Sequence, residues 1–260
     1  MNVSPLFLLS GLGMIAVGVG FVIFWKLRTK LPMAPFLLGA AAWAVSVALK
    51  AGFAVLCNRQ VKSFLSGSLK DSAADPLFWL YIGLLTGVFE CGLVLLLTLW
   101  PKIRHYKFSE AVAFGVGFGA VEAAIIGLAG LASVVVVMVA PSLLPKAVLD
   151  AYSGVSLWTI PAPIVERLSA VVLHTFACAL ILIGARQKRW GYFWLSFAYK
   201  TLVDAVAAWG QLGIGVDTLG HIWLLESVVA AFGIVGLLGL RWLSAREGLA
   251  APGTVNAINT

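Results

Sequence analysis

Charged residues are scarce in this sequence. Asp, Glu, Lys and Arg make up 11% of the 260 residues, whereas soluble domains carry roughly 25%. Hydrophobic residues make up 61%, and several runs exceed about 18 largely apolar residues, the length that indicates a membrane span. This composition excludes an ordinary soluble domain and predicts a multi-pass protein of the cell membrane.

Cysteine is also sparse, and several familiar signatures are absent. The three cysteines, Cys57, Cys91 and Cys178, form no C-x-x-C pair, so the sequence predicts neither a disulfide framework nor a thiolate zinc site. It has no H-E-x-x-H motif, no internal repeat and no strand pattern. We therefore expect a single all-α membrane domain in which the cysteines act as small apolar residues.

Seven apolar runs predict a bundle of about seven transmembrane helices, because a helix needs about 20 residues to cross the hydrocarbon core. The runs cover residues 5–25, 34–57, 76–100, 108–140, 158–184, 190–210 and 219–243. The first run is too long for a signal-peptide core, so we interpret it as a retained span. Residues 248–260 are rich in Gly, Ala and Asn and are expected to form a flexible tail.

The basic residues predict the orientation of the bundle. The net charge is +7, but most Lys and Arg residues lie in short loops after the first, third and fifth runs and in the C-terminal tail. The positive-inside rule places these loops and the C-terminus in the cytoplasm and the N-terminus outside. This distribution argues against a nucleic-acid partner and makes membrane lipid the expected environment.

Ionisable residues interrupt most of the apolar runs. A charged group at the centre of a bilayer costs about 2.5–3.5 kcal/mol on insertion scales, so we expect it to have an oppositely charged partner or a functional role. The residues concerned are Glu90, Glu122, Glu166, Arg167, His174, Lys200, Asp204 and Glu226. Several lie near the middle of their runs, so we expect them to meet in one functional cavity.

Spacing predicts which of these groups share a helix face. Arg167 and His174 are two turns apart and share a face, whereas Glu166 points away from His174. Lys200 and Asp204 are separated by four residues and are predicted to form an ion pair, which could serve only to fix helix packing.

Other residues have structural interpretations. Lys50 is expected to extend its side chain outward to the membrane surface. Glu226 lies nearer the outer surface, where water can reach it. Gly115 and Gly119 form a small-x-x-x-small face that lets another helix approach closely, which would bring Glu122 to a contact between helices.

The side-chain types leave several chemistries open. Carboxylates and an imidazole are groups that zinc accepts as ligands, and zinc beside a glutamate can activate water for peptide hydrolysis. Because His174 is the only mid-span imidazole, such a site would depend mainly on carboxylates, which is unusual for zinc. Buried carboxylates alone equally suit a path for protons or cations.

Several of these residues occur in motifs that resemble the YhfC-like membrane proteins, which are grouped with the PrsW and CAAX-prenyl-protease types of intramembrane metalloproteases. The motifs are Phe89-Glu90, Gly119-Ala120-Val121-Glu122, Glu166-Arg167-Leu168 followed by His174, and Leu202-Val203-Asp204. The resemblance covers the layout of spans over residues 1–243 and implies a helical fold with glutamates and histidines facing a central cavity. It implies that Glu122, His174 and Asp204 hold zinc or another divalent metal, that Glu90 activates water, and that Arg167 orients the substrate.

Three positions depart from the family pattern. Cys91 stands where the family has a second glutamate, Phe118 where it has a histidine, and Lys200 where it has the histidine of a His-x-x-x-Asp motif. A charged lysine binds zinc poorly, but it can supply the positive charge that a metal would bring. The sequence thus leaves three hypotheses. The protein is an intramembrane metallopeptidase, or a non-catalytic relative that binds partner helices or small ligands, or a small proton-coupled transporter that uses Glu122 and Asp204.

Overall fold

The computed structural model describes residues 4–146, 149 and 155–248, and all regular elements within them are helical. The long helices are α1 (Leu8–Thr29), α2 (Ala34–Ser68), α3 (Asp71–Thr86), α6 (Phe108–Val139), α8 (Ala162–Arg186), α9 (Trp190–Trp209) and α10 (Leu219–Arg246). Shorter pieces are η1 (Pro5–Phe7), α4 (Gly92–Leu97), α5 (Pro101–Arg104), η3 (Pro141–Leu143) and η4 (Leu157–Thr159), with two π-helical turns, η2 (Gly87–Cys91) and η5 (Gly210–Ile214). The all-helical prediction is confirmed, whereas the predicted tail lies, after Gly248, outside the described residues.

Among the described residues, six helical stretches are long and apolar enough to cross a membrane. They are Pro5–Thr29, Ala34–Ser68, Asp71–Leu97, Phe108–Val139, Leu157–Arg186 and Leu219–Arg246. These stretches coincide with six of the seven predicted runs and confirm a multi-pass membrane protein. The remaining run, 190–210, forms α9, which carries Lys200 and Asp204 and packs against α3 and α8.

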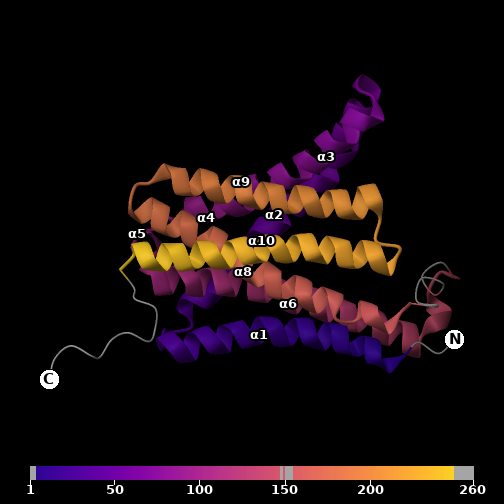
Figure 1. The fold of residues 1–260 in the computed structure, drawn as a ribbon, viewed down its shortest axis with the longest axis horizontal. Helices are drawn as coiled ribbons and strands as arrows, with labels where there is room; N and C mark the ends of the chain where they lie inside the picture. The colour runs from indigo at the N-terminus through magenta and orange to yellow at the C-terminus, as the bar shows by residue number, and fades with distance from the viewer. Residues whose placement is uncertain (1–3, 147–148, 150–154, 249–260) are drawn as a thin grey trace.

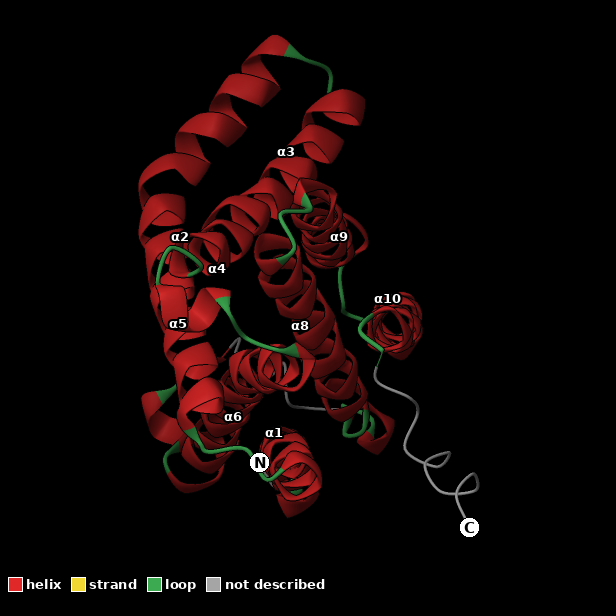
Figure 2. Ribbon diagram, turned by 90° about the vertical axis from the view of Figure 1, so that its left-hand side faces the viewer, coloured by secondary structure: helices red, strands yellow, loops and turns green. Residues whose placement is uncertain are grey.

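Helix α2 is longer than the predicted span. It continues past residue 57 to Ser68, because residues 58–66 contain neither Gly nor Pro to end it. Its second half and the start of α3 form a helical hairpin that projects from one end of the bundle (Figure 1 and Figure 2).

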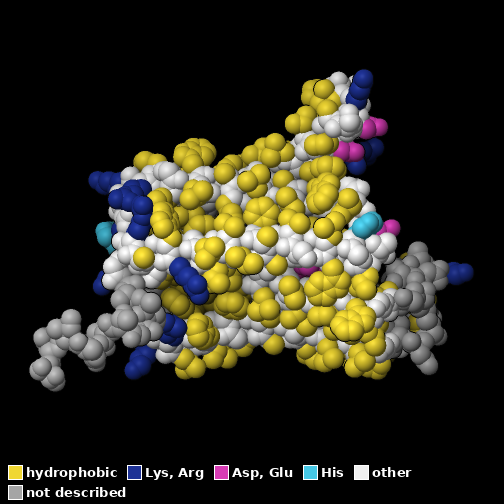
Figure 3. Space-filling view, viewed as in Figure 1, with side chains coloured by type: hydrophobic (Ala, Val, Ile, Leu, Met, Phe, Trp, Pro, Cys, Tyr) yellow, Lys and Arg dark blue, Asp and Glu magenta, His cyan; other side chains and the backbone are white. Residues whose placement is uncertain are grey.

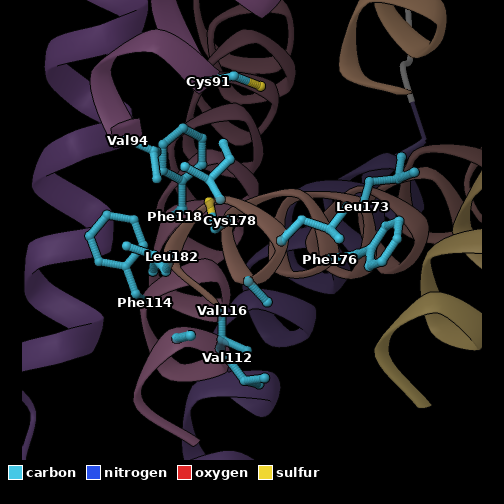
Figure 4. Packing of buried hydrophobic residues seen from close by; sticks show 14 of the residues in the cluster. Cys91, Val94, Val112, Phe114, Val116, Phe118, Leu173, Phe176, Cys178 and Leu182 are labelled. Carbon is cyan, nitrogen blue, oxygen red and sulfur yellow. The ribbon is translucent and has the colours of Figure 1, made fainter. Parts of the chain in front are cut away.

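Helices α6 and α8 form the middle of the bundle (Figure 2). Helix α6 packs against α1, α2 and α8, and α8 also packs against α9 and α10. A Cβ atom on Gly115 would lie 2.5 Å from Thr175 Cα, and one on Gly119 would lie 2.8 Å from Val171 Cα. The predicted close approach of another helix is therefore present, and that helix is α8. Large apolar side chains, including Phe114, fill the space around this contact (Figure 4).

The surface of the bundle separates apolar and basic side chains. Its long flank is hydrophobic, and Lys and Arg gather at its ends, many of them at the end near the C-terminus (Figure 3). This distribution is suited to a helical bundle that spans lipid. The side of the membrane on which each end lies stays a prediction.

Candidate functional site

The structure brings eight ionisable side chains from five elements together inside the bundle. This charged centre comprises Lys50 of α2, Glu90 of η2, Glu122 of α6, Glu166, Arg167 and His174 of α8, and Lys200 and Asp204 of α9. All of the site residues predicted from the sequence belong to it, together with Lys50, which was predicted to point away.

Glu90 lies between two lysines in one half of the charged centre. Its Oε1 atom is 2.6 Å from Lys50 Nζ, and its Oε2 atom is 3.2 Å from Lys200 Nζ. Asp204 Oδ2 lies 3.7 Å from Lys50 Nζ and accepts a hydrogen bond from the Thr86 hydroxyl. The direct Lys200–Asp204 pair predicted from their spacing is thus replaced by contacts that each residue makes with a different helix.

Two backbone features position this half. Helix α3 approaches α9 so closely that a Cβ atom on Gly83 would lie 2.1 Å from the Thr201 carbonyl oxygen. One turn later the chain adopts the π-helical turn Gly87–Cys91, which contains Glu90. A π turn inserts a residue into the helical register and so redirects the side chains that follow, and such turns are frequent at functional sites.

Glu122 organises the other half. Its Oε1 atom is 2.5 Å from Arg167 Nη1, and its Oε2 atom is 2.6 Å from His174 Nε2. The indole of Trp43 donates a hydrogen bond of 2.9 Å to the same Oε2 atom. Arg167 and His174 therefore do share a face, as their two-turn spacing predicts. The second guanidinium nitrogen of Arg167 donates to Glu166.

His174 joins the two halves. Its Nε2 atom contacts Glu122, and its Nδ1 atom lies 3.4 Å from Lys200 Nζ and 3.8 Å from Glu90 Oε2. The ring of Phe118 packs against the imidazole with 5.0 Å between ring centroids. Phe118, which stands where the resemblance predicts a histidine, thus forms an apolar wall on one side of His174.

A cavity of about 210 Å³ opens onto the charged centre. It is lined by Trp43, Val47, Lys50, Glu90, Glu122, His174, Lys200 and Asp204. At about 30 Å³ for each water molecule of liquid, this volume corresponds to about seven waters or one small polar molecule. Of the charged side chains that line this cavity, Lys50 and Asp204 are the most open, with 24% and 27% of their side chains exposed.

The sequence comparisons agree with this architecture. A model of the family described as YhfC intramembrane metalloprotease matches residues 13–229. The chain belongs to this family. It is 24% identical over 253 residues to the uncharacterized membrane protein YhfC of Bacillus subtilis, with 90% of this chain and 93% of that protein covered. No solved structure matches. The resemblance identified from the motifs is confirmed.

The family's description implies a metal, but the donor set of this YhfC-family protein does not fit one. Within the described ranges, no three His, Cys, Asp or Glu side chains are placed to hold one ion. Lys50 and Lys200 occupy both sides of Glu90, and Asp204 is engaged by Lys50 and Thr86 rather than by the other predicted ligands. A divalent ion at this place would be repelled by the ammonium groups of both lysines. Two like unit charges 4 Å apart repel each other by about 4 kcal/mol at an effective dielectric constant of 20.

Three residues of the site escaped sequence reasoning. Trp43, Lys50 and Thr86 lie in spans that look unremarkable, and a lysine near a span end usually reaches for water. Trp43 and Lys50 are seven residues apart and share one face of α2. This shared face could have indicated that both residues belong to the site, because polar side chains on one face of an otherwise apolar helix indicate a buried partner.

Replacement of Trp43 by phenylalanine tests the Glu122 half. The variant loses the indole N–H that contacts Glu122 Oε2, and a hydrogen bond to a charged group is worth about 1.5–3 kcal/mol. We expect the free energy of unfolding in detergent to fall by that amount, measured by thermal and denaturant unfolding. Trp190→Phe is the matched control, because Trp190 is 64% exposed and should change the value by less than about 0.5 kcal/mol. Equal effects of the two substitutions would contradict the assignment.

Proposed function

We propose that this YhfC-family protein acts without a metal, and that its charged centre binds a small polar ligand carrying both positive and negative charge. One observation carries this proposal, namely the placement of Lys50 and Lys200 on the two sides of Glu90. The two ammonium groups supply the positive charge that a metal would otherwise bring to buried carboxylates.

The cavity supports a ligand of mixed charge. The lysines can receive a carboxylate or phosphate, and Asp204 can receive an ammonium group. Because Lys50 and Asp204 are the most exposed charged groups of the lining, an incoming molecule would meet them first. The indole of Trp43 adds an aromatic surface beside Glu122.

Peptide hydrolysis is supported less well. A glutamate that activates water needs an oxygen within hydrogen-bond reach of that water. Glu90 Oε1 is bonded to Lys50, and Glu90 Oε2, which has no hydrogen-bond partner, is buried 3.2 Å from Lys200 Nζ. Arg167 donates to Glu122 and Glu166, so its two terminal nitrogens are engaged rather than turned toward a substrate. The contact between His174 and Glu122 is the feature that favours the metallopeptidase alternative.

Metal analysis of the purified protein decides between the two. We expect less than about 0.1 zinc or other transition metal per chain by mass spectrometry, even after incubation with excess zinc, because two ammonium groups repel a divalent ion. The double substitution Lys50→Met with Lys200→His removes both charges and adds an imidazole, so it is expected to gain zinc.

The controls for this measurement are His174→Ala and Glu122→Ala. About one metal per wild-type chain, lost in both control variants, would overturn the metal-free proposal and support a metallopeptidase.

The ligand itself is tested by thermal unfolding with added amino acids and short peptides. These compounds should stabilise the wild-type protein, because a bound ligand stabilises the folded state, and Asp204→Asn should weaken this stabilisation.

A further inference from the structure

Glu226 of α10 is a buried carboxylate without a partner. The sequence predicted that water can reach Glu226, but only 8% of the residue is exposed. Its Oε2 atom is fully buried and has no hydrogen-bond partner, and no ion pair of Glu226 occurs among the residues that the structure describes. Burial of a charged carboxylate without compensation is strongly unfavourable. A positive charge that binds at this position would therefore stabilise the folded protein.

The packing of α10 on α8 shows what Glu226 faces. A Cβ atom on Gly233 would lie 3.0 Å from Ser169 Cβ, so this face of α10 lies against α8. Glu226 precedes Gly233 by two turns and therefore shares that face. The charged groups that act on it are Glu166 and Arg167, both from the first turns of α8.

Arg167 does not meet the need for positive charge at this place. One terminal nitrogen contacts Glu122 and the other contacts Glu166, so neither of them is left for Glu226. The Nε atom of Arg167 is itself buried without a hydrogen-bond partner. A buried acceptor on Glu226 and a buried donor on Arg167 are thus both left without a hydrogen-bond partner.

We propose that Glu166 and Glu226 form a binding site for one monovalent cation, a proton or an alkali-metal ion, at the α8–α10 interface. The site lies apart from the cavity of the charged centre, whose lining includes neither glutamate. The side chain of Glu166 is 33% exposed, and Glu166 and Glu226 lie within the first three turns of α8 and α10, close to the ends of these helices rather than in the middle of the lipid-facing flank. A cation can therefore reach the pair without crossing the cavity.

The cation site is connected to the charged centre through Arg167. A cation that neutralises Glu166 leaves the guanidinium to Glu122, which contacts His174. Occupancy of the outer pair is thereby expected to change how strongly Glu122 holds His174. This coupling does not depend on whether the cavity binds a ligand or a metal.

Thermal unfolding, followed by the fluorescence of the 10 tryptophans, tests the site in two series. One series exchanges choline for sodium at fixed ionic strength and pH, and the other varies pH without sodium. We expect the wild type to gain a few degrees in Tm in at least one series, because a bound cation stabilises the folded state. Glu226→Gln should remove that response, whereas Asp75→Asn, which changes an exposed carboxylate, should retain it.

Labelling of the wild-type protein with dicyclohexylcarbodiimide provides a second readout that needs no variant to fold. This reagent modifies protonated carboxyl groups in apolar surroundings, and mass spectrometry locates the adduct. An adduct on Glu226 or Glu166 that sodium leaves unchanged identifies the cation as a proton, and an adduct that sodium suppresses identifies an alkali-metal ion that competes. The proposal is overturned if neither glutamate is labelled and the Tm of Glu226→Gln responds to sodium and pH as the wild type does.

Discussion

Replacement of Lys200 by methionine is expected to lower the free energy of unfolding by about 3 kcal/mol, the lower end of what removing one partner of a buried ion pair costs, because Glu90 keeps its contact with Lys50. Glu90 and Lys200 each have only 5% of the side chain exposed, and their charged atoms lie 3.2 Å apart. Methionine fills a similar volume, so the loss reports on charge rather than on packing. The measurement is denaturant unfolding in detergent micelles, followed by tryptophan fluorescence.

Two further variants give this result its meaning. Lys102→Met removes an exposed lysine and should change the free energy by less than about 1 kcal/mol. The double variant Glu90→Gln with Lys200→Met removes both charges and should recover part of the loss, because Lys50 then no longer has to neutralise the buried Glu90 carboxylate alone. If Lys200→Met changes the free energy of unfolding no more than Lys102→Met does, Lys200 does not stabilise the buried charge of Glu90.

Replacement of Gly39 by alanine is expected to separate α2 from α6 and to cost about 3 kcal/mol or more, at or above the upper end of overpacking effects. A Cβ atom at this position would lie 1.9 Å from the Phe114 carbonyl oxygen and 2.8 Å from its carbon. These are backbone atoms in the second turn of α6, so they cannot move aside as a side chain would. The separation would also weaken the contact between Trp43, one turn along α2, and Glu122.

The same helix supplies the matched control. A Cβ atom on Gly52 would meet nothing within 4 Å, so Gly52→Ala should raise the free energy of unfolding by roughly 0.5–1 kcal/mol through helix propensity alone. Thermal unfolding, followed by tryptophan fluorescence, measures the stability of both variants. Opposite signs for the two substitutions are expected, and a stabilised Gly39→Ala variant would contradict the close α2–α6 contact.

The sequence predicted most of the helices because few alternatives exist in lipid. Without water to satisfy its hydrogen bonds, a membrane-spanning backbone adopts helices or closed barrels, and runs of about 20 apolar residues reveal where the helices lie. Helix extension is harder to read. Helix α2 continues to Ser68, beyond the apolar run, because a helix ends only where the chain provides a reason.

The candidate site was predicted as a set of residues but not as a set of contacts. Spacing along one helix placed Arg167 and His174 together, and both contact Glu122. Spacing also suggested a Lys200–Asp204 pair, whereas the structure offers each residue a partner from another helix. Lys50 bonds to Glu90, 40 residues away, and Thr86 bonds to Asp204, 118 residues away.

By itself, the amino-acid sequence determined that this chain is a multi-pass helical protein of the YhfC family with ionisable groups in its spans. These properties follow from composition, run length and local motifs. Only the tertiary structure decided which groups meet. The order of helices around the bundle, the π turn at Gly87–Cys91 and the glycine contacts that bring α3 to α9 together place two lysines beside Glu90. Such contacts depend on how distant helix faces dock, and no local spacing in the sequence specifies that docking.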